Sequence, residues 1–254
     1  MADKAGPQGA ASALLNGLRV LEAFTPSEPS LGVSDIAARV GLHKSTASRI
    51  LSGLADEGYV QRDPATNLYS LGLGVIRLAA SLLADLDIRR AADPELRRLT
   101  AQVRETSALT VWNQVEAIVV EQIPGPQGVK HTASIGTRYN RLESSSVRVF
   151  MADLPEAEAA ALVGSGQVTD SRNLTPAEVV EELASVRAAG YAVNDGRTDP
   201  LELGISAPVR DFRDRVIGCV TLAAPRTRVA AEALPGHVAA VLEAAARVQA
   251  VLGG

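Results

Sequence analysis

The side chains best suited to bind another molecule gather in one short stretch near residue 45. Apolar residues at the spacing of a buried helical stripe accompany them: Ala47, Ile50, Leu51 and Leu54. With that stripe turned inward, a helix from about Lys44 to Glu57 presents a polar face, which comprises His43, Lys44, Ser45, Thr46, Ser48, Arg49 and Ser52. Arginine can bond guanine through two hydrogen bonds, and serine or threonine can bond bases or phosphates. The expected chemistry is hydrogen bonding in the major groove of double-stranded DNA.

The segments around this polar helix predict a helix-turn-helix arrangement. From Ser12 to Phe24, apolar residues at helical spacing predict a helix that breaks at residues 25–29. Ser34 is expected to cap a second helix, which stops at Gly41. The polar helix follows a three-residue turn and ends at Gly58. The short turn between the two helices positions the second one for DNA binding.

A predicted hairpin follows the polar helix and completes a winged helix-turn-helix. Residues 59–62 and 68–71 form its strands, and the loop between them contains proline and asparagine, which favour turns. Arg62 and Asn67 are candidates for contacts with DNA phosphates. An ordinary exposed turn explains these two residues equally well.

The charge pattern confines any DNA contact to a local surface. The chain has a formal net charge of −4 and a pI near 5.5, which gives no overall reason to expect DNA binding. Between Asp35 and Asp56, however, it contains three Lys or Arg residues and no acid. The positive field is therefore expected on the polar helix and its surroundings. For the helix taken alone, a solvated polar face is the competing explanation.

From residue 73 the pattern changes to one long helix and then to mixed helices and strands. The expected linker helix has an apolar seam, available for pairing with a second copy or for packing on its own domain: Val75, Ala79, Leu82 and Leu86. After a break at Asp93-Pro94, strands are expected near 108–114, 117–123, 129–135, 191–194, 202–209 and 216–224, and helices near 94–105, 145–152, 155–163, 175–189 and 232–252. This mixture indicates an antiparallel or mixed sheet flanked by helices.

The predicted fold class is α+β. The expected organisation is a disordered leader at 1–10, a winged helix-turn-helix domain at 11–72, a linker helix at 73–92 and a second domain at 93–254.

Several stretches together resemble the IclR-type transcription regulators over nearly the whole chain. They are LNGLRVLEAF, VSDIAARVGLHKSTASRILSGLADEGYVQRD, YSLG, ELASVRAAGYAVND and SAPVRD. The resemblance implies a winged helix-turn-helix, a linker helix and a GAF-like, ligand-sensing C-terminal domain. It also implies a homodimer or a dimer of dimers on palindrome-like operators. The family's recognition helix starts, in this chain, at His43, Lys44, Ser45, Thr46 and Arg49.

The resemblance also assigns an effector pocket to the C-terminal domain. Its positions are Ser145, Ser146, Asn194, Glu202, Gly204, Thr221 and Ala223. The family's Gly-Thr-Arg is kept at residues 136–138, whereas Val147-Arg148 replaces its Gly-Lys and Gly204 replaces its cysteine. The missing cysteine is expected to leave room for an effector larger than a two- or three-carbon acid. Each polar residue of this set could equally make a structural hydrogen bond.

The residue types in this pocket favour a small polar metabolite with a carboxylate. Ser145 and Ser146 open a predicted helix, whose N-terminal N–H groups attract anions, and Arg148 adds a positive charge. Strand alternation places Ser206 on the same face as Glu202, which would accept a hydroxyl or ammonium group of the ligand. In the alternative, Glu202 pairs with Arg148 or another arginine and closes an empty site.

Other classes of function find little support in the residues. No stretch is apolar and long enough to span a membrane, and the N-terminus lacks the layout of a secretory signal, so the cytoplasm is the expected location. Cys219 is the only cysteine and the three histidines lie far apart, so we expect neither a metal nor another cofactor. No nucleophile-elbow, Walker-loop or HExxH motif is present.

Two alternative functions stay open at this point. In the first, the C-terminal domain has lost its ligand and serves only to assemble oligomers, which the drifted pocket motif favours. A screen in which no compound changes stability or DNA binding would support it. In the second, the C-terminal α/β domain is an enzyme, and turnover of a metabolite without DNA retention would reveal it.

Overall fold

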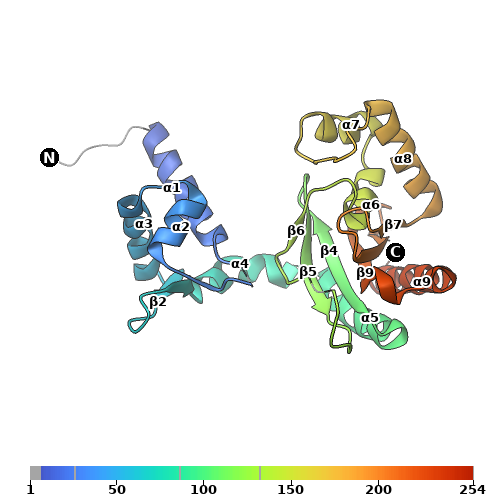
Figure 1. The fold of residues 1–254 in the computed structure, drawn as a ribbon, viewed down its shortest axis with the longest axis horizontal. Coiled ribbons are helices and arrows are strands. Elements are labelled where there is room, and N and C mark those ends of the chain that lie inside the picture. Colours follow the sequence, from blue (N-terminus) through green and yellow to red (C-terminus); the bar gives the residue numbers. More distant parts are fainter. Residues whose placement is uncertain (1–6, 26, 86, 132, 254) are drawn as a thin grey trace. The chain divides into compact units, whose positions relative to one another are not determined.

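The structure, a computed structural model, describes residues 7–25, 27–85, 87–131 and 133–253 (Figure 1). It divides into two compact units, Met1–Asp85 and Leu86–Gly254, so the division falls inside the segment expected as a linker helix. The expected leader lies outside the described residues up to position 6. Positions 7–10 are helical. The first helix begins at Pro7, and proline is well tolerated there because the first N–H groups of a helix have no intrahelical acceptor.

The N-terminal unit is a winged helix-turn-helix. Its elements are α1 (Pro7–Glu22), β1 (Ser30–Leu31), α2 (Val33–Val40), α3 (Lys44–Asp56), β2 (Val60–Arg62), β3 (Tyr69–Leu71) and α4 (Gly74–Asp85). The strands form an antiparallel sheet in the order β1-β3-β2. Ile36 of α2 and Leu51 of α3 are fully buried in one core with Val20 of α1 and Val60 of β2. This core fixes the orientation of α3 within the unit.

Glycines set the ends of the helices in this unit. Gly41 and Gly58 have φ angles of 69° and 74°, so both predicted helix ends adopt the left-handed conformation that glycine tolerates. The expectation that Ser34 caps α2 is wrong. The extended residue Gly32 holds the cap position, and its carbonyl accepts the N–H of Ile36 at 3.0 Å, which places Ser34 inside the first turn.

The C-terminal unit is an antiparallel sheet flanked by helices. Its elements are α5 (Asp87–Val103), β4 (Thr106–Trp112), β5 (Ala117–Ile123), β6 (Arg138–Tyr139), α6 (Ser145–Asp153), α7 (Glu156–Gly164), α8 (Pro176–Ala189), β7 (Ala192–Asp195), β8 (Glu202–Arg210), β9 (Val216–Pro225), two short 3-10 helices at Arg226–Arg228 and Ala231–Ala233, and α9 (Leu234–Val251). The strand order is β6-β5-β4-β9-β8-β7. The predicted fold class is confirmed.

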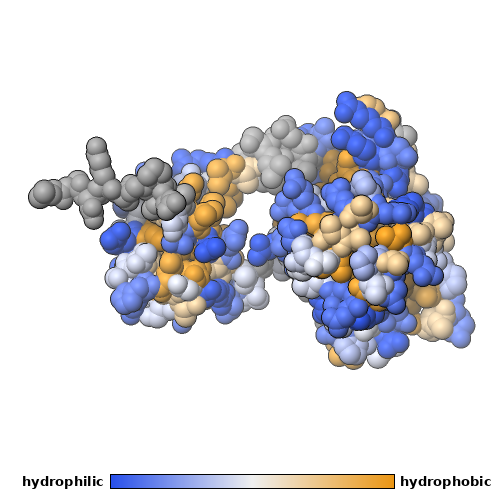
Figure 2. All heavy atoms as spheres, turned by 90° about the horizontal axis from the view of Figure 1, so that it is seen from above, coloured by the Kyte–Doolittle hydropathy of each residue, from blue (hydrophilic) through white to orange (hydrophobic). Residues whose placement is uncertain are grey.

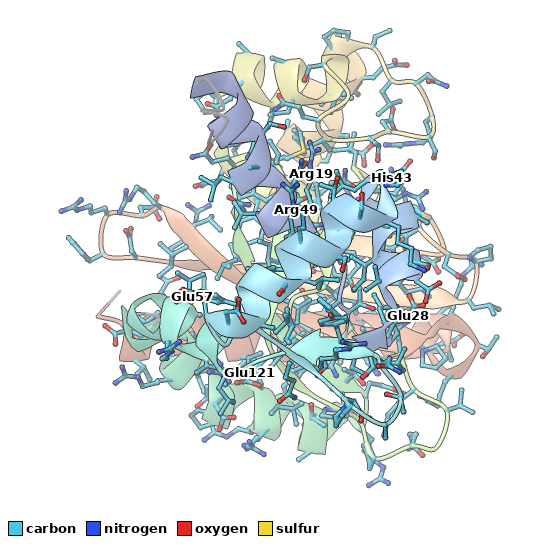
Figure 3. The ribbon with its side chains drawn as sticks, turned by 90° about the vertical axis from the view of Figure 1, so that its left-hand side faces the viewer. Arg19, Glu28, His43, Arg49, Glu57 and Glu121 are labelled. Atoms are coloured by element: carbon cyan, nitrogen blue, oxygen red, sulfur yellow. The ribbon has the colours of Figure 1, made fainter. Side chains whose placement is uncertain are left out.

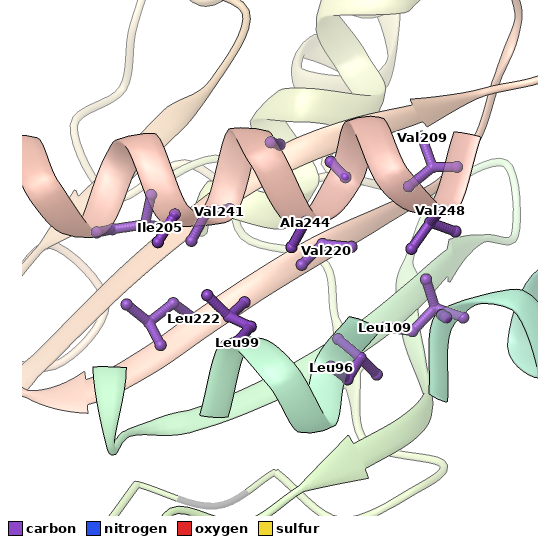
Figure 4. Packing of buried hydrophobic residues seen from close by; sticks show 14 of the residues in the cluster. Leu96, Leu99, Leu109, Ile205, Val209, Val220, Leu222, Val241, Ala244 and Val248 are labelled. Atoms are coloured by element: carbon purple, nitrogen blue, oxygen red, sulfur yellow. The ribbon is translucent and has the colours of Figure 1, made fainter. Parts of the chain in front are cut away.

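The two faces of this sheet are covered by different helices. Helices α5 and α9 pack on one face, where Leu96, Leu99, Leu222 and Val241 are buried together (Figure 4). Helix α6 contacts β8 and β9 and also packs on α8. Its buried residue Phe150 belongs to a second core on the opposite face of the sheet. The second face is the one that carries the small and polar side chains of the candidate pocket.

Two predictions for this unit are wrong, a helix break at Pro94 and a strand at residues 129–135. Pro94 lies inside α5 rather than at a break, because buried side chains on both sides of it, such as Ala91 and Leu96, hold the helix on the core. None of the described residues in 129–135 forms a strand. Val129 is 76% exposed, so it has no core to face, and the N–H of Ala133 donates to the side chain of Gln122 instead of a neighbouring strand.

Candidate DNA-binding and effector sites

Helix α3 turns its predicted polar face to the solvent. His43, Lys44, Ser45, Ser48 and Arg49 are exposed and Thr46 is half-buried. On the opposite side of the same helix, Ala47 and Leu51 are fully buried. Figure 3 shows His43 at the start of α3 and Arg49 farther along the helix, with Arg19 of α1 near Arg49 in that view.

The positive charges of this surface differ in how free they are. Neither Lys44 nor Arg49 has a hydrogen-bond or ion-pair partner among the described residues. Arg39 was counted in the local positive field, but it donates to the carbonyl of Ala23 at 2.8 Å and pairs with Glu28 at 2.8 Å. Arg39 therefore stabilises the fold of the unit through these two contacts.

Arg19 is an exposed cation that the sequence analysis missed. It lies on α1, which packs against α3. Because nothing in the sequence shows that these two helices are in contact, only the fold brings Arg19 to the neighbourhood of the polar face.

His43 organises the start of α3. It is the N-cap residue, and its Nδ1 accepts the N–H of Ser45 at 3.4 Å and lies 2.9 Å from the Ser45 hydroxyl. The N–H of Thr46 donates to the carbonyl of His43 at 2.9 Å, so among the first-turn groups the N–H of Lys44 is the one left without an acceptor in the described residues. The start of α3 therefore presents the backbone N–H and the ammonium group of Lys44 together, which suits an anionic group such as a phosphate.

The wing is held by its own side chains. Arg62 donates to the amide oxygen of Asn67 at 2.6 Å, and Asn67 has a left-handed φ of 59°. Asp63 accepts the N–H of Ala65 at 2.8 Å and the hydroxyl of Thr66 at 2.9 Å, which closes the loop. Arg62 and Asn67 are both exposed and in contact, so the positive charge of Arg62 stays at the wing.

A line of hydroxyl groups joins α6 to the centre of the larger sheet. The hydroxyl of Ser145 lies 2.8 Å from that of Ser206 on β8, which lies 2.8 Å from that of Thr221 on β9. The hydroxyl of Thr221 lies 3.6 Å from the Sγ atom of Cys219, and this sulfur lies 2.9 Å from the hydroxyl of Thr110. Thr221 remains partly accessible although β9 is a central strand. The structure therefore brings together three of the predicted effector residues.

Gly204 allows α6 to approach the sheet. A Cβ atom on Gly204 would lie 3.0 Å from the hydroxyl oxygen of Ser145 and 3.6 Å from the Cβ atom of Asn194. Ser145 thus occupies much of the space that the missing side chain leaves. The expectation that Gly204 enlarges the pocket needs this correction.

Glu202 lies among neutral or weakly basic groups. Its carboxylate accepts the hydroxyl of Thr198 at 2.9 Å and lies 3.6 Å from Nε2 of His131. Burial and the nearby charge of Glu202 raise the pKa of Tyr139 to about 12. The sequence analysis did not identify His131 and Tyr139 as neighbours of Glu202. Among the described residues Glu202 has no arginine partner, so the alternative in which an arginine closes the site is not what the structure shows.

The amide of Asn194 holds the turn that leads to Glu202. Its oxygen accepts the N–H groups of Arg197 at 2.9 Å and Thr198 at 3.2 Å, and its nitrogen lies 2.5 Å from the Thr198 hydroxyl. Asn194 pairs with Gly204 across β7 and β8. Its side chain is therefore committed to the turn.

Arg148 is engaged by the protein rather than free for a ligand. It is buried and donates to the carbonyl of Val193 at 2.5 Å, with Glu182 at 3.5 Å. Burial lowers the pKa of Arg148 to about 10, and the positive charge of Arg197 acts in the same direction. The anion-binding role expected for Arg148 conflicts with these contacts. Ser146 lies at the same helix start, where its hydroxyl is 3.1 Å from that of Ser144.

Within the described residues there is neither a cluster of metal ligands nor a helix that could span a membrane. No group of three or more His, Cys, Asp or Glu side chains among them could hold a metal ion. In the same part of the chain, no helix has the length and hydropathy to cross a membrane.

Comparison with known proteins gives consistent matches over most of the chain. The model of the IclR helix-turn-helix domain matches residues 13–64, and the model described as bacterial transcriptional regulator IclR C-terminal matches residues 80–250. The glycerol operon regulatory protein of Streptomyces griseus is 30% identical over 237 residues, which cover 92% of this chain and 93% of that protein. The transcriptional regulator KipR of Bacillus subtilis is 29% identical over 234 residues, 89% of this chain and 91% of KipR.

A solved structure adds a bound ligand to this comparison. It is that of an IclR homologue from Microbacterium hydrocarbonoxydans in complex with 4-hydroxybenzoate. The two chains are 27% identical with a TM-score of 0.78, and the match covers 95% of this chain and 99% of the homologue.

Proposed function

This chain belongs to the IclR family of bacterial transcriptional regulators, and from that premise we propose how its two units recognise DNA and a ligand. It is a DNA-binding transcriptional regulator and not an enzyme. In the proposal, α3 enters the major groove of an operator in the cytoplasm, with Ser45, Ser48 and Arg49 toward the bases. Lys44 and the start of α3 contact phosphates, and Arg62 does so from the wing.

One observation supports this DNA-binding surface above all others. The outward face of α3 carries two cations that have no partner among the described residues, while Ala47 and Leu51 on the inward side of the same helix are fully buried. A surface helix that only needed solubility could pair its charges along its own face. The unpaired charges instead favour a polyanionic partner.

The role of Lys44 can be tested without knowing the operator. We expect Lys44→Ala to weaken binding to any duplex. The negative slope of log affinity against log salt concentration should become less steep by about 0.9, the value for one phosphate contact. Fluorescence anisotropy of a labelled duplex at several salt concentrations measures this slope. Lys130→Ala, in the other unit, is the matched control. A Lys44→Ala slope equal to that of the wild type would remove Lys44 from the interface.

We propose that the C-terminal unit binds a small organic acid that carries a hydroxyl or amino group. The N–H groups at the start of α6, with Ser145, Ser146 and Thr221, suit the carboxylate. Glu202 and Tyr139 suit the second polar group. The homologue that binds 4-hydroxybenzoate supports this ligand class. In this proposal Ser206 orients Ser145 and Thr221, Asn194 positions Glu202, Arg148 supports α6, and binding of the effector changes the affinity for the operator.

The hydroxyl line gives a prediction for ligand binding. In a thermal-shift screen of hydroxy, amino and aromatic acids, Thr221→Val should weaken the hits by about 1–3 kcal/mol, roughly 5- to 150-fold, because one buried hydrogen bond is lost. Ser185→Ala, which removes an exposed hydroxyl on α8, should bind them like the wild type. Equal affinity of Thr221→Val and the wild type would place the ligand elsewhere.

The drifted pocket motif keeps a second candidate function in view, a ligand-independent regulator. In that case no compound shifts the melting temperature of the wild type or its DNA affinity.

We further propose that the chain acts as a homodimer, alone or as a dimer of dimers, on an operator with two half-sites. Winged helix modules usually bind paired half-sites, since one module buries little surface. The predicted seam is only partly described: Val75 and Ala79 are half-buried, Leu86 lies outside the described residues, and so does the side chain of Leu82. Hydrophobic side chains are nevertheless exposed on the N-terminal unit (Figure 2), on α4 and on α1.

Two leucines of α1 give the dimer a test. Leu14 and Leu18 are 67% and 45% exposed and lie one helical turn apart, so they form one apolar surface. We expect Leu14→Lys with Leu18→Lys to shift the protein toward monomer in light scattering and to weaken operator binding. Leu201→Lys, equally exposed in the other unit at 69%, should leave the mass unchanged. A wild type that is monomeric at micromolar concentration would contradict the dimer.

A further inference from the structure

Three arginines from different segments meet at one carboxylate on α8. Glu182 pairs with Arg172 at 2.6 Å, with Arg197 at 2.8 Å and with Arg148 at 3.5 Å. Its side chain is only 16% exposed, and that of Arg148 is 6% exposed. The neighbouring residue Glu181 is exposed and has no ion-pair partner among the described residues. Glu182 therefore differs sharply from its neighbour on the same helix.

Two of these three arginines lie in different walls of the candidate effector site. Arg148 belongs to α6, the helix whose first residue, Ser145, reaches the sheet. Arg197 lies in the turn between β7 and β8, next to Thr198, which donates to Glu202. The third, Arg172, lies in the loop before α8, which is outside both walls.

The buried position of Arg148 makes the carboxylate necessary. A buried guanidinium needs a counter-charge and hydrogen-bond acceptors, and the Nε atom of Arg148 has no acceptor among the described residues. Arg197 and Arg172 add further positive charge beside it. Asp170 also pairs with Arg172 at 3.5 Å and the charge of Glu143 acts on Arg148, but without Glu182 neither Arg148 nor Arg197 keeps an ion-pair partner among the described residues. The repulsion between them would then push α6 and the turn apart.

We propose that Glu182 is a positioning residue that joins α6 to the β7–β8 turn and so sets the spacing between the two ends of the effector site. The name effector site rests on the function proposed above, whereas the coupling of the two walls does not. Glu182 would not touch the ligand. It would act through Arg148 on the carboxylate end and through Arg197 on the Glu202 end.

Hydrogen–deuterium exchange of the full, ligand-free protein tests this coupling. In Glu182→Gln we expect roughly tenfold faster exchange in residues 143–149 and in residues 194–202, because both walls lose their shared anchor. Residues 234–251 of α9 should exchange as in the wild type, which shows that the unit is folded. Glu181→Gln is the matched control and should change neither wall. Equal patterns in Glu182→Gln and Glu181→Gln would overturn the proposal.

Single-arm variants separate coupling from general loosening. Arg197→Gln should accelerate residues 194–202 but not 143–149, and Arg172→Gln should accelerate neither wall. If Arg172→Gln opened both walls as much as Glu182→Gln, the effect would be a loss of stability and the proposal would fail. Should Glu182→Gln not fold, Glu182→Asp, which keeps the charge but withdraws it by one methylene group, takes its place with the same expected pattern. Failure of the proposed effector function would appear separately, as an absence of thermal shifts in the wild type.

Discussion

Arg49→Ala lowers the affinity for a specific operator by about 1–3 kcal/mol, roughly 5- to 150-fold, and brings specific and scrambled duplexes closer together. The reason is that Arg49 projects from the middle of the exposed face of α3, where a bidentate contact with guanine distinguishes base pairs. The fold should not change, because Arg49 makes no hydrogen bond or ion pair with any described residue. Fluorescence anisotropy on both duplexes measures the effect.

Two controls make the Arg49 result interpretable. Lys44→Ala should weaken both duplexes by the same factor, since it contacts phosphate rather than bases. Arg213→Ala removes an exposed arginine from the β8–β9 hairpin of the other unit and should leave both affinities unchanged. A wild-type specificity ratio in Arg49→Ala would show that α3 does not read the sequence.

Leu51→Ala unfolds the N-terminal unit more easily, by about 2–5 kcal/mol, because it leaves a cavity in a small core. Leu51 is fully buried on α3 with Ile36 and Val60 around it. The only tryptophan, Trp112, lies in the C-terminal unit, so its fluorescence reports that unit alone. We expect urea unfolding followed by circular dichroism to show an early transition that Trp112 fluorescence does not.

The control for Leu51→Ala is one position away. Ser52→Ala removes an exposed hydroxyl from the same helix and should change the free energy of unfolding by less than about 0.5 kcal/mol. If Leu51→Ala left the early transition where Ser52→Ala leaves it, the assignment of the inward face of α3 would be wrong.

The elements that were predicted well are those determined by local pattern. The period of Ala47 and Leu51 identifies the inward face of α3, and a left-handed glycine at Gly41 stops the preceding helix. Alternation along β8 also places Ser206 on the same face as Glu202, because side chains of a strand alternate strictly. The start of α2 was missed by two residues, since glycine can cap a helix with its backbone alone.

The features that were missed depend on contacts between distant parts of the chain. Arg148 has two partners, Glu182 and Val193, and both lie on other elements. The sequence therefore shows the positive charge of Arg148 but not the contacts that hold it. For the same reason Arg39 counts as a free charge in the sequence although the fold uses it. The strand expected at 129–135 had a suitable residue pattern, but β5 pairs with residues 138–139 at its edge instead.

The central claim, that α3 reads a specific operator, is tested most directly by genome-wide mapping of binding sites for the wild type and Arg49→Ala in parallel. The wild type should occupy a discrete set of promoters that share two related half-sites, whose centres lie about 10 base pairs, or a multiple of one helical turn, apart. Arg49→Ala should lose most of these sites while the protein stays folded and abundant. The account would be contradicted by a wild type without enriched sites, or by an Arg49→Ala protein that occupies the same promoters equally well.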